Sequence, residues 1–224
     1  MSASTAPPAV PPAARATPVS RALLAAFGLV AAVDLVSLLA GAEPGHQIAK
    51  PLLMPLLAAY AATRKAPKLL VAALLSGWAG DVLLLSDADG AFLAGMGSFA
   101  VGHVCYLALF GRRRASPALG ALYAAALAGT VALLWSDLPA ELRIPVAGYS
   151  LLLTAVAHRA SSLGLLAGLG GALFLLSDTL IATGVAAWPR PPAPDFWVML
   201  TYVAAQYLLT TGALRSSGEG RDTP

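Results

Sequence analysis

The sequence predicts an all-α membrane protein, a polytopic bundle of about eight transmembrane helices. Of the 224 residues, 58% are hydrophobic and 11% are charged, whereas a typical soluble domain has roughly 25% charged residues. The mean hydropathy of +0.75 extends over most of the chain, so much of its apolar surface must face lipid. This composition excludes an ordinary water-soluble enzyme.

Short polar segments divide the apolar region into eight predicted spans. Their expected bounds are 22–40, 48–63, 68–85, 91–110, 117–135, 144–158, 162–183 and 196–214. The second and sixth are shorter than the roughly 20 residues that cross a bilayer untilted, so either could be recessed. The first could instead be a cleaved signal peptide. Its apolar run is longer than a signal core and contains Asp34, which favours a retained helix.

Two tails flank the predicted transmembrane domain of residues 21–214. Residues 1–20 are mainly Ala, Pro, Ser and Thr without apolar periodicity, and residues 215–224 are also polar. We expect both tails to be disordered, because they cannot bury enough apolar surface to offset the entropy of ordering. The single cysteine, Cys105, excludes an internal disulfide and a multi-cysteine zinc site.

The basic residues indicate the orientation of the bundle. Eleven of the fourteen Lys and Arg residues fall on one side of the eight spans: Arg15, Arg21, Arg64, Lys65, Lys68, Arg112, Arg113, Arg114, Arg159, Arg215 and Arg221. By the positive-inside rule, this side and both termini are cytoplasmic. The basic residues are not interleaved with aromatics as a nucleic-acid groove requires, so no nucleic-acid partner is expected.

Three acids lie inside the predicted spans: Asp34, Asp81 and Asp178. Each costs about 2.5 to 3.5 kcal/mol at the centre of a membrane helix, so such residues usually face the bundle interior and serve a function. Counted at 1.5 Å per residue, all three lie roughly 6 to 9 Å below the outer boundary. Asp34 could equally be a structural residue.

Other polar side chains are expected near this layer. Lys50, Tyr202 and Gln206 fall in the outer half of the second and eighth spans, while His103 and Tyr106 lie deeper. Lys50 could bind an anion or merely extend to the interface, and His103 could be a packing residue. Ser76 and Ser177 are near the acids in sequence. A polar cavity in the outer half of the bundle is the simplest arrangement.

The residue types and their spacing argue against two kinds of catalytic site in this cavity. The three histidines, His46, His103 and His158, lie at different depths, so a His-rich zinc site is not expected. There is no G-x-S-x-G motif of a serine hydrolase. Two carboxyl groups in a low-dielectric layer should not both ionise, which gives one acid and one carboxylate. Such a pair could catalyse hydrolysis or carry protons through a transporter.

Five segments, in order, resemble the YhhN-like lysoplasmalogenase family of multi-spanning membrane proteins. They are KPLLMPL at 50–56, ALLSGWAGDVLL at 73–84, FAVGHVCY at 99–106, GALFLLSD at 171–178 and YVAAQYL at 202–208. The resemblance covers about residues 22–214. It implies an eight-helix fold and hydrolysis of the vinyl ether bond of lysoplasmalogens, a class of lysophospholipid. The products would be a fatty aldehyde and glycerophosphoethanolamine or glycerophosphocholine.

The reaction implied by this resemblance suits the predicted acids. Protonation of the outer alkene carbon creates an oxocarbenium ion, which water captures as a hemiacetal. We expect Asp81 and Asp178 to be the catalytic pair, with no metal or cofactor. Lys50 would hold the head-group phosphate. The side chains expected to orient water or substrate are His103, Tyr106, Ser177, Tyr202 and Gln206, and possible additional site residues are Asp34 and Ser76.

The Ala-rich sequence with its Pro-containing tail is typical of a bacterial protein, so the expected location is the plasma (inner) membrane of a bacterium. Another lysolipid or alkenyl ether could then be the substrate. The main alternative is a proton-coupled transporter or flippase of a small amphiphile that uses the same acids. A non-catalytic lipid-binding or partner-binding bundle is a third.

Overall fold

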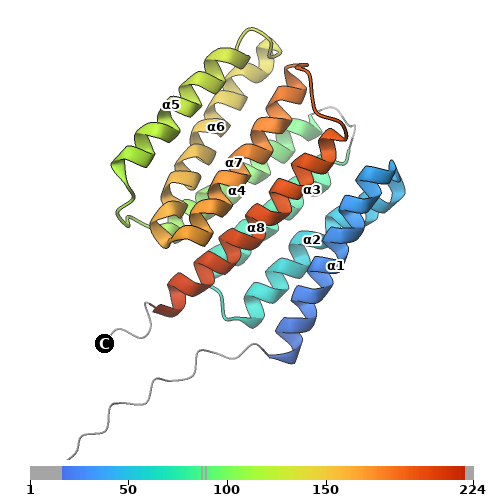
Figure 1. Cartoon of the computed structure of the whole chain (residues 1–224), viewed down its shortest axis with the longest axis vertical. Helices are drawn as coiled ribbons and strands as arrows, with labels where there is room; N and C mark the ends of the chain where they lie inside the picture. The colour runs from blue at the N-terminus through green and yellow to red at the C-terminus, as the bar shows by residue number, and fades with distance from the viewer. Residues whose placement is uncertain (1–16, 87, 89, 220–224) are drawn as a thin grey trace, which may run out of the picture.

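A computed structural model describes residues 17–86, 88 and 90–219, and these residues form eight α-helices and one short 3₁₀ helix (Figure 1). The elements are α1 (Pro18–Ala40), α2 (Glu43–Thr63), α3 (Lys68–Leu83), α4 (Ala91–Phe110), α5 (Pro117–Leu134), α6 (Ala140–Ala160), η1 (Ser161–Leu163), α7 (Leu165–Val185) and α8 (Pro194–Glu219). The all-helical prediction is therefore confirmed. Tail residues 1–16 and 220–224, which include Arg15 and Arg221, lie outside the described residues.

The second and sixth helices are longer than the sequence predicts. Helix α2 begins at Glu43 and α6 at Ala140, and each has 21 residues. Both have an acid in the first turn, Glu43 and Glu141 respectively. A negative charge there interacts favourably with the positive end of the helix dipole. The polar residues that ended the apolar pattern therefore belong to the helices.

The first and last helices extend further into the two predicted tails than the sequence indicates. Helix α1 starts at Pro18, where the Thr17 side chain accepts a hydrogen bond from the Ser20 amide and proline occupies the first turn. Helix α8 continues to Glu219, and Ser216 is buried. The expectation of disorder is therefore wrong for residues 18–20 and 215–219.

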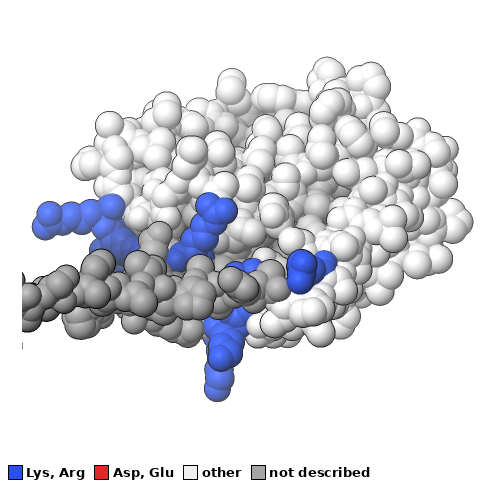
Figure 2. Space-filling model, turned by 60° about the horizontal axis from the view of Figure 1, so that its bottom comes forward, with Lys and Arg blue, Asp and Glu red and all other residues white. Residues whose placement is uncertain are grey.

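Five of the described helical segments are long and apolar enough to cross a membrane: α1, α4, α5, α6 together with η1, and α7. Helix α3 has only 16 residues. Figure 2 shows one end of the bundle, where Lys and Arg side chains project and no acidic side chain appears among the uncovered atoms. The chain is thus a multi-pass membrane protein. The count of eight spans and the cytoplasmic termini remain predictions.

Helix α8 lies in the middle of the bundle, where it packs closely on α7 and also contacts α1, α2 and α3 (Figure 1). Close approach depends on small residues, as in many membrane bundles. A Cβ atom at Gly170 would lie 2.8 Å from the Leu209 amide nitrogen, and one at Gly212 would lie 2.8 Å from the Ala167 nitrogen. Helix α5 is peripheral and packs mainly against α6.

Candidate active site

Six helices, α2, α3, α5, α6, α7 and α8, place polar side chains around one pocket of about 90 Å³. Five of the predicted site residues line it: Lys50 on α2, Asp81 on α3, Ser177 and Asp178 on α7, and Tyr202 on α8. The sequence could not show that these helices converge. The pocket is large enough for several waters, since one water needs about 10–15 Å³.

Asp81 is held between α3 and α8. It is 2% exposed, and the Tyr202 hydroxyl donates to its Oδ2 at 2.8 Å. Gly77 and Gly80 on the same helix leave room for this arrangement, because a Cβ at Gly77 would lie 3.2 Å from the Tyr202 hydroxyl oxygen. The tyrosine therefore fixes the Asp81 carboxyl group toward the pocket.

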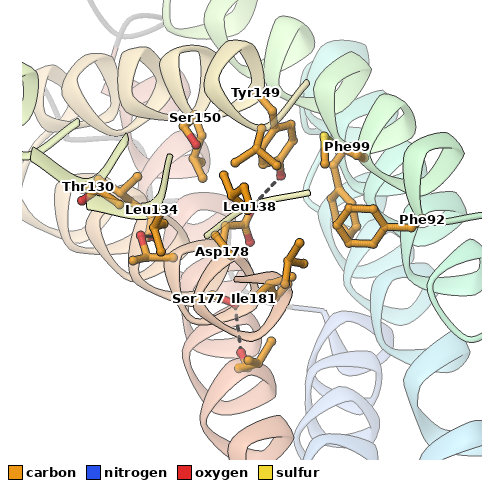
Figure 3. A pocket seen from close by; sticks show the side chains of 18 of the residues that line it. Phe92, Phe99, Thr130, Leu134, Leu138, Tyr149, Ser150, Ser177, Asp178 and Ile181 are labelled. Carbon is orange, nitrogen blue, oxygen red and sulfur yellow. Dashed lines mark hydrogen bonds between the residues drawn. The ribbon is translucent and has the colours of Figure 1, made fainter. Parts of the chain in front are cut away.

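Asp178 has a tyrosine partner of its own. The Tyr149 hydroxyl, on α6, donates to Asp178 Oδ2, as the dashed line in Figure 3 shows. Ser177, its neighbour, donates to the Val198 main-chain oxygen at 3.0 Å and so joins α7 to α8. The site contains two Asp–Tyr pairs, each made of side chains from different helices. The charges of the two acids are close enough to interact.

Lys50 lies deeper than the sequence indicates. Because α2 begins at Glu43, Lys50 is about 10 Å along the helix rather than at its entrance. Pro51 is likewise an interior proline and not a first-turn residue. Lys50 is 9% exposed, and its charge acts electrostatically on Asp81. Helix α2 packs against α3, which carries that acid.

The rest of the pocket is mostly apolar. Figure 3 shows Phe92 and Phe99 on one side and Leu134 on the other, with Leu138 between them. One further charged side chain, Arg143, lines the pocket from the first turn of α6. Such walls suit a hydrocarbon chain, and the few polar groups can fix its orientation.

A second polar cluster lies beside this pocket. His103, Tyr106 and Gln206 line a small neighbouring cavity that shares Phe99 with the larger pocket. The Tyr106 hydroxyl donates to Gln206 Oε1 at 2.7 Å. Among the described residues, both ring nitrogens of buried His103 lack a hydrogen-bond partner. Buried polar atoms normally have a partner, and this cavity has no space for a water molecule to supply one.

The structure separates the two additional candidates from this site. Asp34, on α1, is fully buried and bonds through Oδ1 to Nδ1 of His46, on α2, at 2.8 Å. Ser76 lies at the contact between α3 and α4, where its main-chain oxygen accepts from the Ser98 hydroxyl at 2.8 Å. Neither residue lines the acid pocket.

Sequence reasoning missed Tyr149, His46 and Arg143. Tyr149 is a polar aromatic residue in an apolar run, a signal that could have been used. The pairing of His46 with Asp34 depends on the α1–α2 turn, where Gly41 has a positive φ of 66°. Arg143 lies one residue before the predicted sixth span of 144–158, so the apolar pattern gave it no role in the site. Among the described residues there is no group of three or more His, Cys, Asp or Glu side chains able to hold a metal.

The fold and the pocket define a class of protein, a multi-pass helical membrane protein with two buried acids in an apolar cavity. The sequence profile of the YhhN family matches residues 45–213. The chain belongs to the YhhN family.

Curated relatives carry a more specific name. The human lysoplasmalogenase TMEM86B (Homo sapiens) is 39% identical over 149 residues, which cover 66% of this chain and 65% of the relative. The rat lysoplasmalogenase TMEM86B (Rattus norvegicus) is 37% identical over 67% of this chain and 63% of the relative. The bovine lysoplasmalogenase TMEM86A (Bos taurus) is 30% identical over 61% of each chain. The matched segment thus spans less than two thirds of these relatives. No solved structure matches the chain.

Proposed function

We propose that this protein is a membrane lysoplasmalogenase, which hydrolyses the vinyl ether bond of a lysoplasmalogen to a fatty aldehyde and a glycerophospho-alcohol. The observation that carries the proposal is the placement of Asp81 and Asp178, from two helices, in one largely apolar pocket. The names of the curated relatives support the same activity. The apolar walls accommodate the alkenyl chain while the acids face the ether.

The two acids have different surroundings, and this suggests a division of roles. Each acid accepts a hydrogen bond from a tyrosine hydroxyl, but Asp81 has in addition the positive charge of Lys50, which favours a negative charge on this acid. Asp178 therefore supplies the proton, and Asp81 stabilises the cation as its carboxylate. Lys50 therefore acts on the site through Asp81. This role replaces the binding of the head-group phosphate, which was expected when Lys50 was placed at the start of the second span.

The reaction then needs only groups present in the pocket and one water. Asp178 protonates the outer alkene carbon, and the double-bond electrons form that new C–H bond, leaving an oxocarbenium ion beside Asp81. Water adds to the carbon attached to the ether oxygen and returns its proton to Asp178. The bond from the resulting hemiacetal carbon to the glycerol oxygen then breaks. The hemiacetal hydroxyl gives up its proton to form the aldehyde, and the glycerol oxygen takes up a proton and leaves as the alcohol.

The reacting water has room in the acid pocket itself, whose volume of about 90 Å³ holds several waters. The neighbouring cavity, lined by His103, Tyr106 and Gln206, has no space for a water molecule. Phe174 packs against both His103 and Tyr202, so this buried cluster supports the wall of the acid pocket. We assign these side chains to positioning Tyr202 and the substrate, and Ser177 to the fixed packing of α7 on α8.

The transporter alternative uses the same acids. One turn from Asp178 on α7, the buried Phe174 packs against the His103 ring with a centroid distance of 4.9 Å. Filled space on this side of the acids does not favour a path through the bundle. Proton-gradient-dependent accumulation of a lysolipid in vesicles, without aldehyde release, would favour transport.

The test is aldehyde release from a synthetic lysoplasmalogen by purified protein in detergent. The saturated ether lysolipid, which has no alkene to protonate, serves as the non-hydrolysable control. We expect Asp81→Asn and Asp178→Asn to lose turnover while remaining folded, and Asp195→Asn, at an exposed acid outside the pocket, to keep it. Full activity in both pocket variants would contradict the proposal.

A further inference from the structure

The acid pocket contains a second cation whose place differs from that of Lys50. Arg143 lies in the first turn of α6, at the end of the bundle where the α5–α6 loop connects the helices. Its side chain is partly exposed, whereas Lys50 is buried. The pocket therefore has one cation near its acids and one toward the solvent end.

The Arg143 guanidinium is held in a fixed position. Its Nε donates to the Leu138 main-chain oxygen and its Nη2 to the Ser136 main-chain oxygen, each at 3.2 Å. An arginine has five N–H donors, so these two bonds leave three for a ligand. A guanidinium with free donors on its outer nitrogens can bind phosphate through two parallel hydrogen bonds.

The spacing along α6 matches the geometry of the substrate. Arg143 precedes Tyr149 by six residues, a rise of about 9 Å, and Tyr149 bonds to Asp178. In a lysoplasmalogen, a three-carbon glycerol backbone separates the vinyl ether oxygen from the phosphate. With the ether at Asp178, the phosphate would extend toward the first turn of α6.

The start of α6 adds to this positive environment. Its N-cap residue, Pro139, has no side-chain acceptor for the first-turn amides. The free amides give a helix N-terminus a partial positive charge that favours anions. The exposed Glu141 opposes this charge, so the guanidinium is the principal group for an anion.

We infer that Arg143 binds the head-group phosphate and thereby makes the pocket selective for phosphate-bearing ether lipids over neutral alkenyl or alkyl glycerols. This inference rests on the proposed function for the position of the ether. It assigns the two cations separate duties: Arg143 holds the substrate's phosphate and Lys50 supports Asp81.

Equilibrium binding tests the inference without requiring turnover. The probes are a saturated ether lysophospholipid and the matching alkylglycerol without phosphate, titrated by calorimetry into purified protein in detergent. We expect wild type to prefer the phospholipid. Arg143→Met should raise its Kd at least about tenfold, the loss expected for hydrogen bonds to a charged group, and should leave the Kd for the alkylglycerol within about twofold. The Kd of Arg143→Lys for the phospholipid should lie between those of wild type and Arg143→Met.

A matched control is Arg190→Met, at an exposed arginine that does not line the pocket, which should bind both probes as wild type does. Equal weakening of both probes in Arg143→Met would show that the residue only holds the α5–α6 loop, and would overturn the inference. Wild type that binds both probes equally, or neither, would also overturn it. Aldehyde release, measured separately, decides the proposed function, so failure of one is distinguishable from failure of the other.

Discussion

Gly80, the residue before Asp81, allows α3 and α4 to approach closely, and replacing it with alanine should displace the acid. A Cβ atom there would lie 2.6 Å from two carbons of the Phe99 ring and 3.1 Å from the Gly95 main-chain oxygen. Ordinary contact begins at 3.4 Å, so the ring would have to withdraw by 0.8 Å. It packs edge-on against Tyr202 and Phe174, with centroid distances of 5.9 and 6.4 Å.

Because neither the ring nor the main chain can move freely, α3 must shift away from α4 and carry Asp81 with it. A misplacement near 1 Å can cost roughly 100-fold in rate, so we expect Gly80→Ala to lower kcat by about 10- to 100-fold. Overpacking should also lower the free energy of unfolding by about 1–3 kcal/mol. Aldehyde release and thermal unfolding in detergent measure the two effects.

The matched control is Gly97→Ala on α4, where a Cβ would meet nothing within 4 Å. It should retain the turnover of wild type and gain slightly in stability, since alanine is the better helix former. If Gly80→Ala and Gly97→Ala had the same turnover and the same unfolding temperature, the argument from close helix approach would be refuted.

Two further predictions concern charge and metal. Lys50→Ala should lower kcat more than it raises KM, because the lost charge supports Asp81; a change in KM alone would instead indicate a substrate contact. A chelator such as EDTA should leave aldehyde release unchanged, since the acids have tyrosine and lysine neighbours rather than a set of metal ligands; loss of activity that added zinc restores would contradict this.

The helices could be predicted from the sequence because lipid imposes long apolar runs. The bounds of α4 agree at both ends, and those of α1, α2, α3 and α5 at one. The errors occur where a polar residue can belong to a helix that leaves the hydrocarbon region, as Glu43 does at the start of α2. The apolar pattern does not predict the helix there, because it is favoured by a negative charge in its first turn rather than by contact with lipid.

The acids of the site could be found from the sequence, because an acid inside a membrane helix is energetically unfavourable and therefore rare. Their hydrogen-bond partners could not be found in this way. Asp81 and Asp178 are conspicuous in apolar helices, whereas the pairing of Tyr149 with Asp178 is seen only once α6 lies beside α7. The predicted depth of an acid in the membrane was a weaker indication that it belongs to the site. Asp34 has the same predicted depth as the other two acids, but it pairs with His46 and does not line the pocket. Which helices are neighbours depends on three-dimensional packing, and the apolar pattern along the chain does not reveal it.

The most direct test of the central claim, proton transfer to the alkene carbon, is the reaction of a synthetic lysoplasmalogen with the purified protein in D₂O, with immediate reduction of the aldehyde to its alcohol. If Asp178 delivers a solvent-exchanged proton to the outer alkene carbon, mass spectrometry should find one deuterium on the carbon next to the former carbonyl. Asp178→Asn should form no product. Aldehyde that carries no deuterium at this carbon would contradict the mechanism.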